Sequence, residues 1–248
     1  MSAAPSQTDE AAFLGGRISL RQPVKGYRAG LDAALLAAAL DASPGDRALE
    51  LGCGAGAALL SAGVLYPEAD FLGLEREDAA FALACANVER NRLSQRVRVE
   101  QADALSWKVE RDFDAVFLNP PWYEPGEIRE PPPGRKAAWI ADAGGSAWID
   151  AALKALRPKG VLTLIHRADA LPLALSALQG RAGAVCVRPV QPRSESPATR
   201  VLVRAVKGAR TPLTLLSPFI LHPDGPTSDY TQDAEAVLRG QAGLVMRG

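Results

Sequence analysis

The sequence predicts an α/β fold: a doubly wound, mostly parallel, Rossmann-like sheet whose last strand runs antiparallel. Short apolar runs alternate with helix-like segments between residues 48 and 178, which is typical of parallel strands joined by right-handed helical crossovers. A glycine-rich turn, Gly52 to Gly56, joins the first strand to its helix. The last two strands, Val185–Val187 and Val201–Val206, are separated by a loop with no helical pattern, so we expect them to pair antiparallel.

Short apolar runs bounded by polar or breaker residues predict the strands. In chain order they are Ala48–Leu51, Phe71–Leu74, Val97–Val99, Phe113–Leu118, Val161–Ile165, Val185–Val187 and Val201–Val206. Segments with apolar residues at helical spacing, or rich in Ala and Leu, predict the helices. In chain order they are Leu31–Leu40, Ala57–Tyr66, Glu77–Leu93, Ser146–Leu156, Leu171–Leu178 and Thr231–Arg239. The first helix stops before Pro44-Gly45, and the last is closed by Gly240.

The domain organisation follows from this pattern. We expect a flexible N-terminus (1–16), a single domain (17–240) and a C-terminal tail (241–248). Within the domain, residues 122–145 are rich in proline and glycine, and they include Pro131-Pro132-Pro133. This segment is too long for a simple connection, and long loops are often functional. We therefore expect it to be a lid or a substrate-binding loop.

The composition makes several classes of protein improbable. The chain has 248 residues, 48% of them hydrophobic, which is enough for a large core. No apolar run approaches the roughly 20 residues that span a bilayer, and Met1–Glu10 lacks a signal-peptide pattern. We therefore expect a cytoplasmic protein without membrane contact. Three scattered cysteines and two histidines predict no disulfide framework, no metal site and no His-based triad.

The formal net charge is zero, but the basic residues are distributed unevenly. Residues 11–31 hold several basic side chains and no acid, and residues 181–210 hold a basic series opposed by Glu195 alone. The basic residues of the second stretch are Arg181, Arg188, Arg193, Arg200, Arg204, Lys207 and Arg210. Local basic surfaces of this kind contact phosphates, although a charge run alone is as compatible with a solvated surface.

The turn from Glu50 to Gly56 is a candidate cofactor site. Gly52, Gly54 and Gly56 permit positive φ angles and let a ligand approach the backbone closely. In open α/β sheets, ligands bind beyond the carboxyl ends of the strands, near such a turn. The spacing G-x-G-x-G differs from the G-x-G-x-x-G of nicotinamide sites, where a helix N-terminus holds a pyrophosphate. A methyl donor such as S-adenosylmethionine has no phosphate.

Acidic residues at the strand ends extend this site. Glu75 ends the second strand, where a carboxylate can accept hydrogen bonds from both ribose hydroxyls. Asp103, followed by Ala104, is placed to accept from an adenine amino group. Glu50 can face the cationic methionine end of the donor, directly or through water, and Asp32 can pair with the donor's amino group. One such acid is usually a helix cap, but their combination with the glycine turn predicts a nucleoside cofactor.

A second motif, Asn119-Pro120-Pro121-Trp122, follows the buried strand Phe113–Leu118. The two prolines end strand pairing because neither has an N–H to donate. The side-chain carbonyl of Asn119 and the backbone carbonyl of Pro120 can each accept one N–H of a planar amine, and Trp122 can stack on its ring. Beside a methyl donor, this motif predicts methyl transfer to such an amine.

Together the motifs resemble the tRNA adenine-N6 methyltransferases that modify the anticodon loop of valine tRNA. The residues that carry the resemblance are Asp32 to Leu36, Leu49 to Gly56, Gly73 to Glu75, Asn87 with Asn91, Asn119 to Trp122, Arg200 to Arg204 and Tyr230-Thr231. The resemblance covers residues 17–240. It implies a class I methyltransferase fold, S-adenosylmethionine as donor, tRNA as substrate, and Asn119, Pro120, Pro121 and Trp122 as the amine-binding catalytic motif. Asn119 is expected to contribute to the cofactor site as well. Trp122 departs from the family, which more often has Tyr or Phe there.

Other functions remain open at this point. Related enzymes with an Asn-Pro-Pro-aromatic motif methylate guanine N2 in rRNA or a glutamine amide in proteins. A non-catalytic RNA-binding protein that keeps the donor pocket is a third possibility, disfavoured by the presence of Asn119. A dehydrogenase is disfavoured by the glycine spacing. The basic stretch 181–210 favours RNA over protein, with Arg200 and Arg204 as expected contacts, and the sequence does not indicate an oligomeric state.

Overall fold

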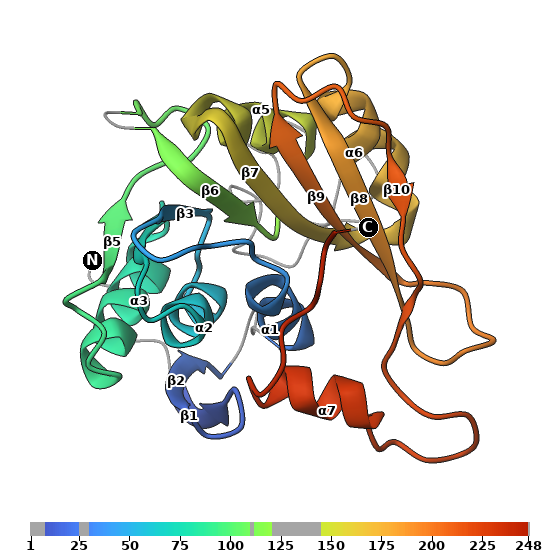
Figure 1. The fold of residues 1–248 in the computed structure, drawn as a ribbon. Helices are drawn as coiled ribbons and strands as arrows, with labels where there is room; N and C mark the ends of the chain where they lie inside the picture. The colour runs from blue at the N-terminus through green and yellow to red at the C-terminus, as the bar shows by residue number, and fades with distance from the viewer. Residues whose placement is uncertain (1–7, 25–29, 110–111, 121–144, 248) are drawn as a thin grey trace, which may run out of the picture.

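The computed structural model describes residues 8–24, 30–109, 112–120 and 145–247. A central sheet lies between two layers of helices (Figure 1). One face carries α1 (Leu31–Ala38), α2 (Ala57–Leu65) and α3 (Asp78–Arg90), and the other carries α5 (Gly145–Ala155) and α6 (Leu171–Leu178). Helices on both faces of one sheet make this a doubly wound α/β fold.

The sheet has nine strands in the described residues, in the order β10-β8-β9-β7-β6-β3-β4-β5, with β11 beside β8. Their bounds are β3 (Arg47–Leu51), β4 (Asp70–Glu75), β5 (Val97–Gln101), β6 (Phe113–Leu118), β7 (Leu156–Arg167), β8 (Ala182–Gln191), β9 (Arg200–Lys207), β10 (Thr214–Leu215) and β11 (Phe219–Ile220). Only β9 runs antiparallel to its neighbours, β7 and β8. The predicted mostly parallel sheet, with an antiparallel strand at Val201–Val206, is therefore confirmed.

The largest difference from the predicted strand bounds is at the start of β7. α5 ends at Ala155 and β7 starts at Leu156, so β7 is longer than the expected Val161–Ile165. Leu156 pairs with Phe113, and the register then shifts before Ala115 pairs with Val161. Residues 157–159 are exposed, and because they are polar or proline the sequence predicts a turn there.

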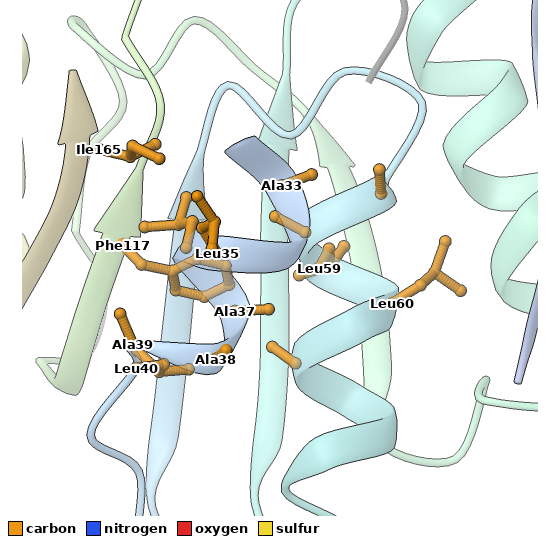
Figure 2. Packing of buried hydrophobic residues seen from close by; sticks show 14 of the residues in the cluster. Ala33, Leu35, Ala37, Ala38, Ala39, Leu40, Leu59, Leu60, Phe117 and Ile165 are labelled. Atoms are coloured by element: carbon orange, nitrogen blue, oxygen red, sulfur yellow. The ribbon is translucent and has the colours of Figure 1, made fainter. Parts of the chain in front are cut away.

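Successive strand residues point to opposite faces, and this alternation builds two separate cores. Toward α1 and α2, Phe117 of β6 and Ile165 of β7 are fully buried, and Figure 2 shows Leu35 of α1 lying against Phe117. On the other face, Leu118 packs in the second core with Trp148 from α5. Because α1 is buried from Asp32 to Ala38, its small and aliphatic composition follows from its position.

The N-terminal segment is more ordered than the sequence suggests. β1 (Thr8–Phe13) lies within the segment expected to be flexible, and it pairs antiparallel with β2 (Ile18–Pro23). Leu14, Ile18 and Leu20 are buried in the first core. The hairpin therefore packs against the domain through Leu14 and β2, and the more exposed β1 is ordered by its pairing with β2.

The C-terminal segment also packs on the core. The helix predicted at Thr231–Arg239 is α7 (Gln232–Leu238), and the Thr231 hydroxyl caps it by accepting the N–H of Ala234 at 3.1 Å. Beyond it, the N–H of Leu244 donates to the carbonyl of Ala38 at 2.8 Å, and Leu244 and Met246 are buried. Residues expected to form a tail thus cover α1.

Candidate active site

The glycine turn lies at the carboxyl edge of β3, as predicted. Gly52, Gly54 and Gly56 all have positive φ angles, +70°, +56° and +88°. A Cβ on Gly52 would lie 3.1 Å from the Trp148 ring, whereas a Cβ on Gly54 would meet no atom of the described residues within 4 Å. The backbone at Gly54 therefore faces open space, which gives a ligand direct access to it.

Glu75, at the end of β4, is fixed against this turn. One carboxylate oxygen accepts the N–H of Gly54 and the other accepts the N–H of Glu77, both at 2.8 Å. Its residue surface is only 8% exposed. Each oxygen keeps a second lone pair, so the carboxylate can still accept a pair of hydroxyl groups such as those of a ribose.

Glu50 lies on the same face of the sheet and is almost completely buried, with 3% of its surface exposed. Burial raises the pKa of Glu50 well above its usual range, the charge of Glu75 raises it further, and the N–H of Leu59 offsets only part of this. Its Oε2 has no hydrogen-bond partner in the structure described. A buried carboxyl oxygen without a partner favours a ligand that brings a donor or a positive charge.

Gly73, on β4 between these carboxylates, makes room for the turn. A Cβ there would lie 2.6 Å from a methyl of Leu59 and 2.8 Å from the Cys53 sulfur. Burial, followed by the charges of Glu50 and Glu75, raises the pKa of the Cys53 thiol well above its ordinary value. Cys53 is therefore a small packing residue, because reactivity requires the thiolate.

Asp103 follows β5 in an exposed turn, where its Oδ1 accepts the N–H of Leu105 at 3.0 Å. Ala104 is buried beside it and lines a cavity of about 180 Å³ bounded also by Leu51, Trp107 and Lys154. The structure therefore places Asp103 and Ala104 at the carboxyl edge beyond β5. Their expected role beside an adenine ring remains a prediction.

Asp32, expected near the donor's amino group, is already ion-paired. The Nε–H of Arg200 donates to its Oδ1. Burial raises the pKa of Asp32 above its ordinary value, and the charge and hydrogen bond of Arg200 offset only part of that rise. The sequence could not indicate this partner, because α1 and β9 are far apart in the chain.

Asn119 lies at the end of β6, next to the glycine turn. Leu118 pairs with Leu51 across β6 and β3, so Asn119 comes level with Gly52. Phe117 faces α1 and α2, and alternation along the chain places Asn119 on that face, which also carries Glu50. Pro120 is buried. Pro121 and Trp122, like the lid-like loop as far as residue 144, lie outside the described residues.

Asn87 of α3 and Asn91, which directly follows this helix, hold the N-terminal hairpin against the domain. Asn87 accepts the N–H of Arg21 and donates to the carbonyls of Arg21 and Ala55, each at 2.9 Å. Asn91 makes the equivalent pair of bonds with Ser19. The side chain of Asn87 thereby links the hairpin to the glycine turn, a role that its helical position alone did not reveal.

The basic stretch 181–210 does not form the free basic surface that was expected. Arg204 donates to Asp41 at 2.8 Å, and its side chain is only 11% exposed. Arg188 donates to the carbonyls of Ser217 and Val245, and Arg193 donates to those of Pro223 and Thr227. Arg188 and Arg193 thus hold the C-terminal segment in place, because long side chains can carry backbone hydrogen bonds over several ångströms.

The described residues contain no group of three His, Cys, Asp or Glu side chains that could hold a metal ion. Within the same ranges, no helix is both long and apolar enough to cross a bilayer. All three cysteines are free.

Comparison with known proteins identifies relatives of this chain. Residues 28–178 match the family model of the methyltransferase small domain. A tRNA1(Val) (adenine(37)-N6)-methyltransferase of Vibrio cholerae is 29% identical over 160 residues, which cover 62% of this chain and 65% of that protein. The chain thus spans just under two thirds of that relative. The match confirms the resemblance to tRNA adenine-N6 methyltransferases that the motifs predicted.

Two further relatives differ in their named substrates. A release factor glutamine methyltransferase of Gloeobacter violaceus is 31% identical over 156 residues, covering 59% of this chain and 54% of that protein. The crystal structure of a predicted O-methyltransferase from Agrobacterium tumefaciens superposes with a TM-score of 0.72 and 26% identity, covering 86% of this chain and 98% of that one. Proteins similar to this chain are therefore named for different methyl acceptors.

Proposed function

The chain belongs to the methyltransferase small domain family, and from this premise we propose that it methylates the exocyclic N6 amino group of an adenine in tRNA. S-adenosylmethionine is the donor that membership implies, because it carries a reactive methyl group on a positively charged sulfur. One observation supports the proposal most: Glu50, Glu75 and Gly54 share the carboxyl edge at which Asn119 ends the neighbouring strand.

The residues present fit this donor. Gly54 leaves its backbone open, Glu75 has lone pairs for two ribose hydroxyls, and Asp103 lies beyond the next strand toward the adenine. The unpartnered oxygen of Glu50 is suited to the cationic methionine end. Three neighbouring strands, β3, β4 and β5, thus supply the groups that hold one extended nucleoside.

The acceptor chemistry is proposed for Asn119 and Pro120. An aromatic amine is a weak nucleophile because its lone pair is delocalised into the ring. If the Asn119 side chain and the Pro120 carbonyl each accept one N–H, the nitrogen lone pair is directed at the incoming methyl group, and orientation supplies most of the catalysis. Trp122 is proposed to stack on the target base, which must leave its own stack to reach the site.

Adenine in tRNA is preferred because the Vibrio cholerae relative carries that name and because the motifs resemble that family. A second candidate is the amide of a protein glutamine, favoured by the Gloeobacter violaceus relative. Both acceptors are planar and carry an NH2 group, so Asn119 and Pro120 would treat them alike.

The test incubates the protein with methyl-labelled S-adenosylmethionine and either bulk tRNA or total protein from a strain that lacks the gene. Mass spectrometry of the digested nucleosides should show label in N6-methyladenosine. Label in N2-methylguanosine, or in a glutamine residue, would replace the proposed substrate. Tight donor binding without label in any acceptor would favour a non-catalytic RNA-binding protein.

A further inference from the structure

Three segments that are distant in the sequence meet at the amino edge of the sheet, opposite the edge that carries the proposed active site. In chain order they are residues 154–160, 178–184 and 205–211. β9 is antiparallel to both β7 and β8, so its end lies beside the starts of those two strands. Val206 of β9 pairs with Val161 of β7, and the next residue pairs with Ala182 of β8. Figure 1 shows the arrowhead of β9 at this edge, in the upper part of the view.

The charged residues of these three segments are all basic. The segments contain six lysine or arginine residues and no aspartate or glutamate. The basic residues are Lys154, Arg157, Lys159, Arg181, Lys207 and Arg210, which we call the basic corner. Lys207 is half-buried, and the other five are exposed. Although the whole chain has no formal net charge, positive charge is therefore concentrated at this edge of the sheet.

Hydrogen bonds hold the three segments of the basic corner together. The N–H of Gly208 donates to the carbonyl of Arg181 at 2.8 Å, and Arg210 follows two residues later. The ammonium of Lys207 donates to the carbonyl of Leu156, at the start of β7. The basic side chains thus extend from stretches of backbone that are in direct contact. Like charges gathered in this way repel one another unless an anion is bound beside them.

Only two members of the basic corner have a carboxylate partner among the described residues. Arg157 pairs with Asp114 at 2.5 Å, and Arg181 pairs with Asp150 at 2.6 Å. Lys207 is held by a backbone carbonyl instead. The remaining three form neither an ion pair nor a side-chain hydrogen bond within the part of the chain that the structure describes, and they are Lys154, Lys159 and Arg210. The fold therefore does not account for the charge of these three side chains.

The distance between the basic corner and the proposed active site suits a long anionic substrate. β7 runs from one edge of the sheet to the other, and Val161 and Arg167 are about 20 Å apart at roughly 3.3 Å per residue. RNA carries a phosphate at every nucleotide, so an RNA that places one base at Asn119 extends past this distance. Phosphate contacts fix the position of a nucleic acid, whereas base contacts specify it. A basic surface separate from the site can therefore hold the body of the RNA.

We propose that the basic corner binds the phosphate backbone of the RNA substrate, with Lys154, Lys159 and Arg210 as its principal contacts. The inference rests on the proposed function for the class of substrate, RNA, but not for the base that is methylated. It replaces the contact at Arg200 and Arg204 that the sequence favoured, because both of those side chains are paired with carboxylates.

Binding of fluorescein-labelled bulk tRNA, measured by anisotropy over a range of salt concentrations, tests this surface. Lys159→Gln combined with Arg210→Gln should weaken binding about tenfold and reduce the slope of log K against log salt by roughly 1.5, because each lost phosphate contact removes about 0.7–0.9.

Arg92→Gln combined with Arg98→Gln is the matched control. Both arginines are exposed and have no ion pair in the described residues, but Arg98 lies in β5 and Arg92 precedes it, at the far side of the sheet. This variant should bind tRNA within about twofold of the parent, with the same salt slope. Equal losses in the two double variants, or an unchanged slope in the first, would overturn the inference.

A charge-conserving variant separates phosphate binding from support of the fold. Lys159→Arg combined with Arg210→Lys keeps both charges and should bind tRNA as the parent does, whereas a loss equal to that of the glutamine variant would refute phosphate binding. In methylation assays the glutamine variant should have a raised KM for tRNA and an unchanged kcat at saturating tRNA. A lower kcat with an unchanged KM would overturn the inference.

The two proposals fail in different ways. A parent protein that does not bind tRNA would overturn both. Methylation of tRNA, combined with unchanged tRNA binding by the glutamine variant, would overturn the inference alone. Weakened tRNA binding by that variant, combined with label in a base other than adenine, would support the inference and refute the proposed acceptor. Binding to phosphatidylglycerol vesicles that only the glutamine variant loses, with its tRNA binding intact, would assign the basic corner to an anionic membrane instead.

Discussion

The amide nitrogen of Asn87 donates to the backbone carbonyl of Ala55 at 2.9 Å, inside the glycine turn of the proposed donor site. The same side chain forms two bonds with Arg21 of β2. Asn87 is fully buried, so its bonds are shielded from water. The N-terminal hairpin, which contains no proposed site residue, is therefore linked through the hydrogen bonds of Asn87 to the turn that we propose as the donor site.

Asn87→Ala should destabilise the protein and weaken donor binding. It leaves the N–H and carbonyl of Arg21 and the carbonyl of Ala55 without partners, at a cost of about 2–3 kcal/mol in the free energy of unfolding. Urea denaturation measures the stability, and calorimetry with S-adenosylhomocysteine measures binding. Asn91→Ala is the control, because Asn91 holds Ser19 in the same way but does not contact the turn. Equal losses of donor affinity in both variants would contradict the connection.

Gly54→Ala should impair donor binding beyond its effect on stability. The left-handed φ of +56° costs an alanine about 1–2 kcal/mol, and the new Cβ points into the space left open at the turn. Gly45 is the matched control: its φ is +81° and no described atom lies within 4 Å of a Cβ there, but it precedes β3, at the edge of the sheet opposite the turn. Gly45→Ala should lose similar stability and no donor affinity. Unimpaired binding by Gly54→Ala would place the donor elsewhere.

Glu50→Gln should become progressively more stable than the parent as the pH rises. The raised pKa of Glu50 means that the folded state holds its proton above pH 4.5, where the unfolded state has released it. The free energy of unfolding of the parent therefore falls with rising pH across the window from 4.5 to the folded-state pKa, and glutamine removes this dependence. Melting temperatures from about pH 5 upward measure the difference.

Asp41→Asn is the control for this pH series. The pKa of Asp41 is lowered because hydrogen bonds from Arg247 and Arg204 outweigh burial, so its contribution is lost only as the pH falls below 3.8. The difference in melting temperature between Asp41→Asn and the parent should stay constant over the pH range in which Glu50→Gln becomes more stable than the parent. If the difference in melting temperature between Glu50→Gln and the parent does not change with pH, Glu50 is ionised in the folded protein.

Asn119→Ala should abolish methyl transfer while the affinity for S-adenosylhomocysteine stays within a few-fold of the parent. The side chain is proposed to orient the acceptor amine, whereas the donor is proposed to be held mainly by groups on and after β3 and β4. Single-turnover assays on tRNA measure transfer, and calorimetry measures donor binding. Unchanged turnover, or a donor affinity that falls with activity, would exclude the assigned role.

The centre of the sheet was predictable because its strands, such as β3 and β6, are buried on both faces and form short apolar runs. β3 and β6 match their predicted bounds within a residue. The hairpin strand β1 was missed because Thr8–Phe13 has weak strand propensity. Its partner strand β2 is held by the side chains of Asn87 in α3 and Asn91 just after that helix. Tertiary contacts of that kind leave no local pattern.

The site was predictable only where its residues adjoin strand ends. Glu50, Glu75 and Asp103 follow from the strand pattern, because parallel strands end at one edge. The partner of Asp32 could not be predicted from the strand pattern, because Arg200 is distant in the chain and was interpreted as part of a basic surface. Charge counting could not show that Arg188, Arg193 and Arg204 serve the fold.

The burial of Leu244 and Met246 against the core of α1 has a consequence for synthesis. Translation delivers the N-terminal part of a chain first, so α1 emerges long before the segment that covers it. During that interval the nascent chain exposes an Ala- and Leu-rich helix that is buried from Asp32 to Ala38 in the finished protein. Exposed apolar surface invites association, so chaperone dependence should be greatest for chains that stop short of residue 244.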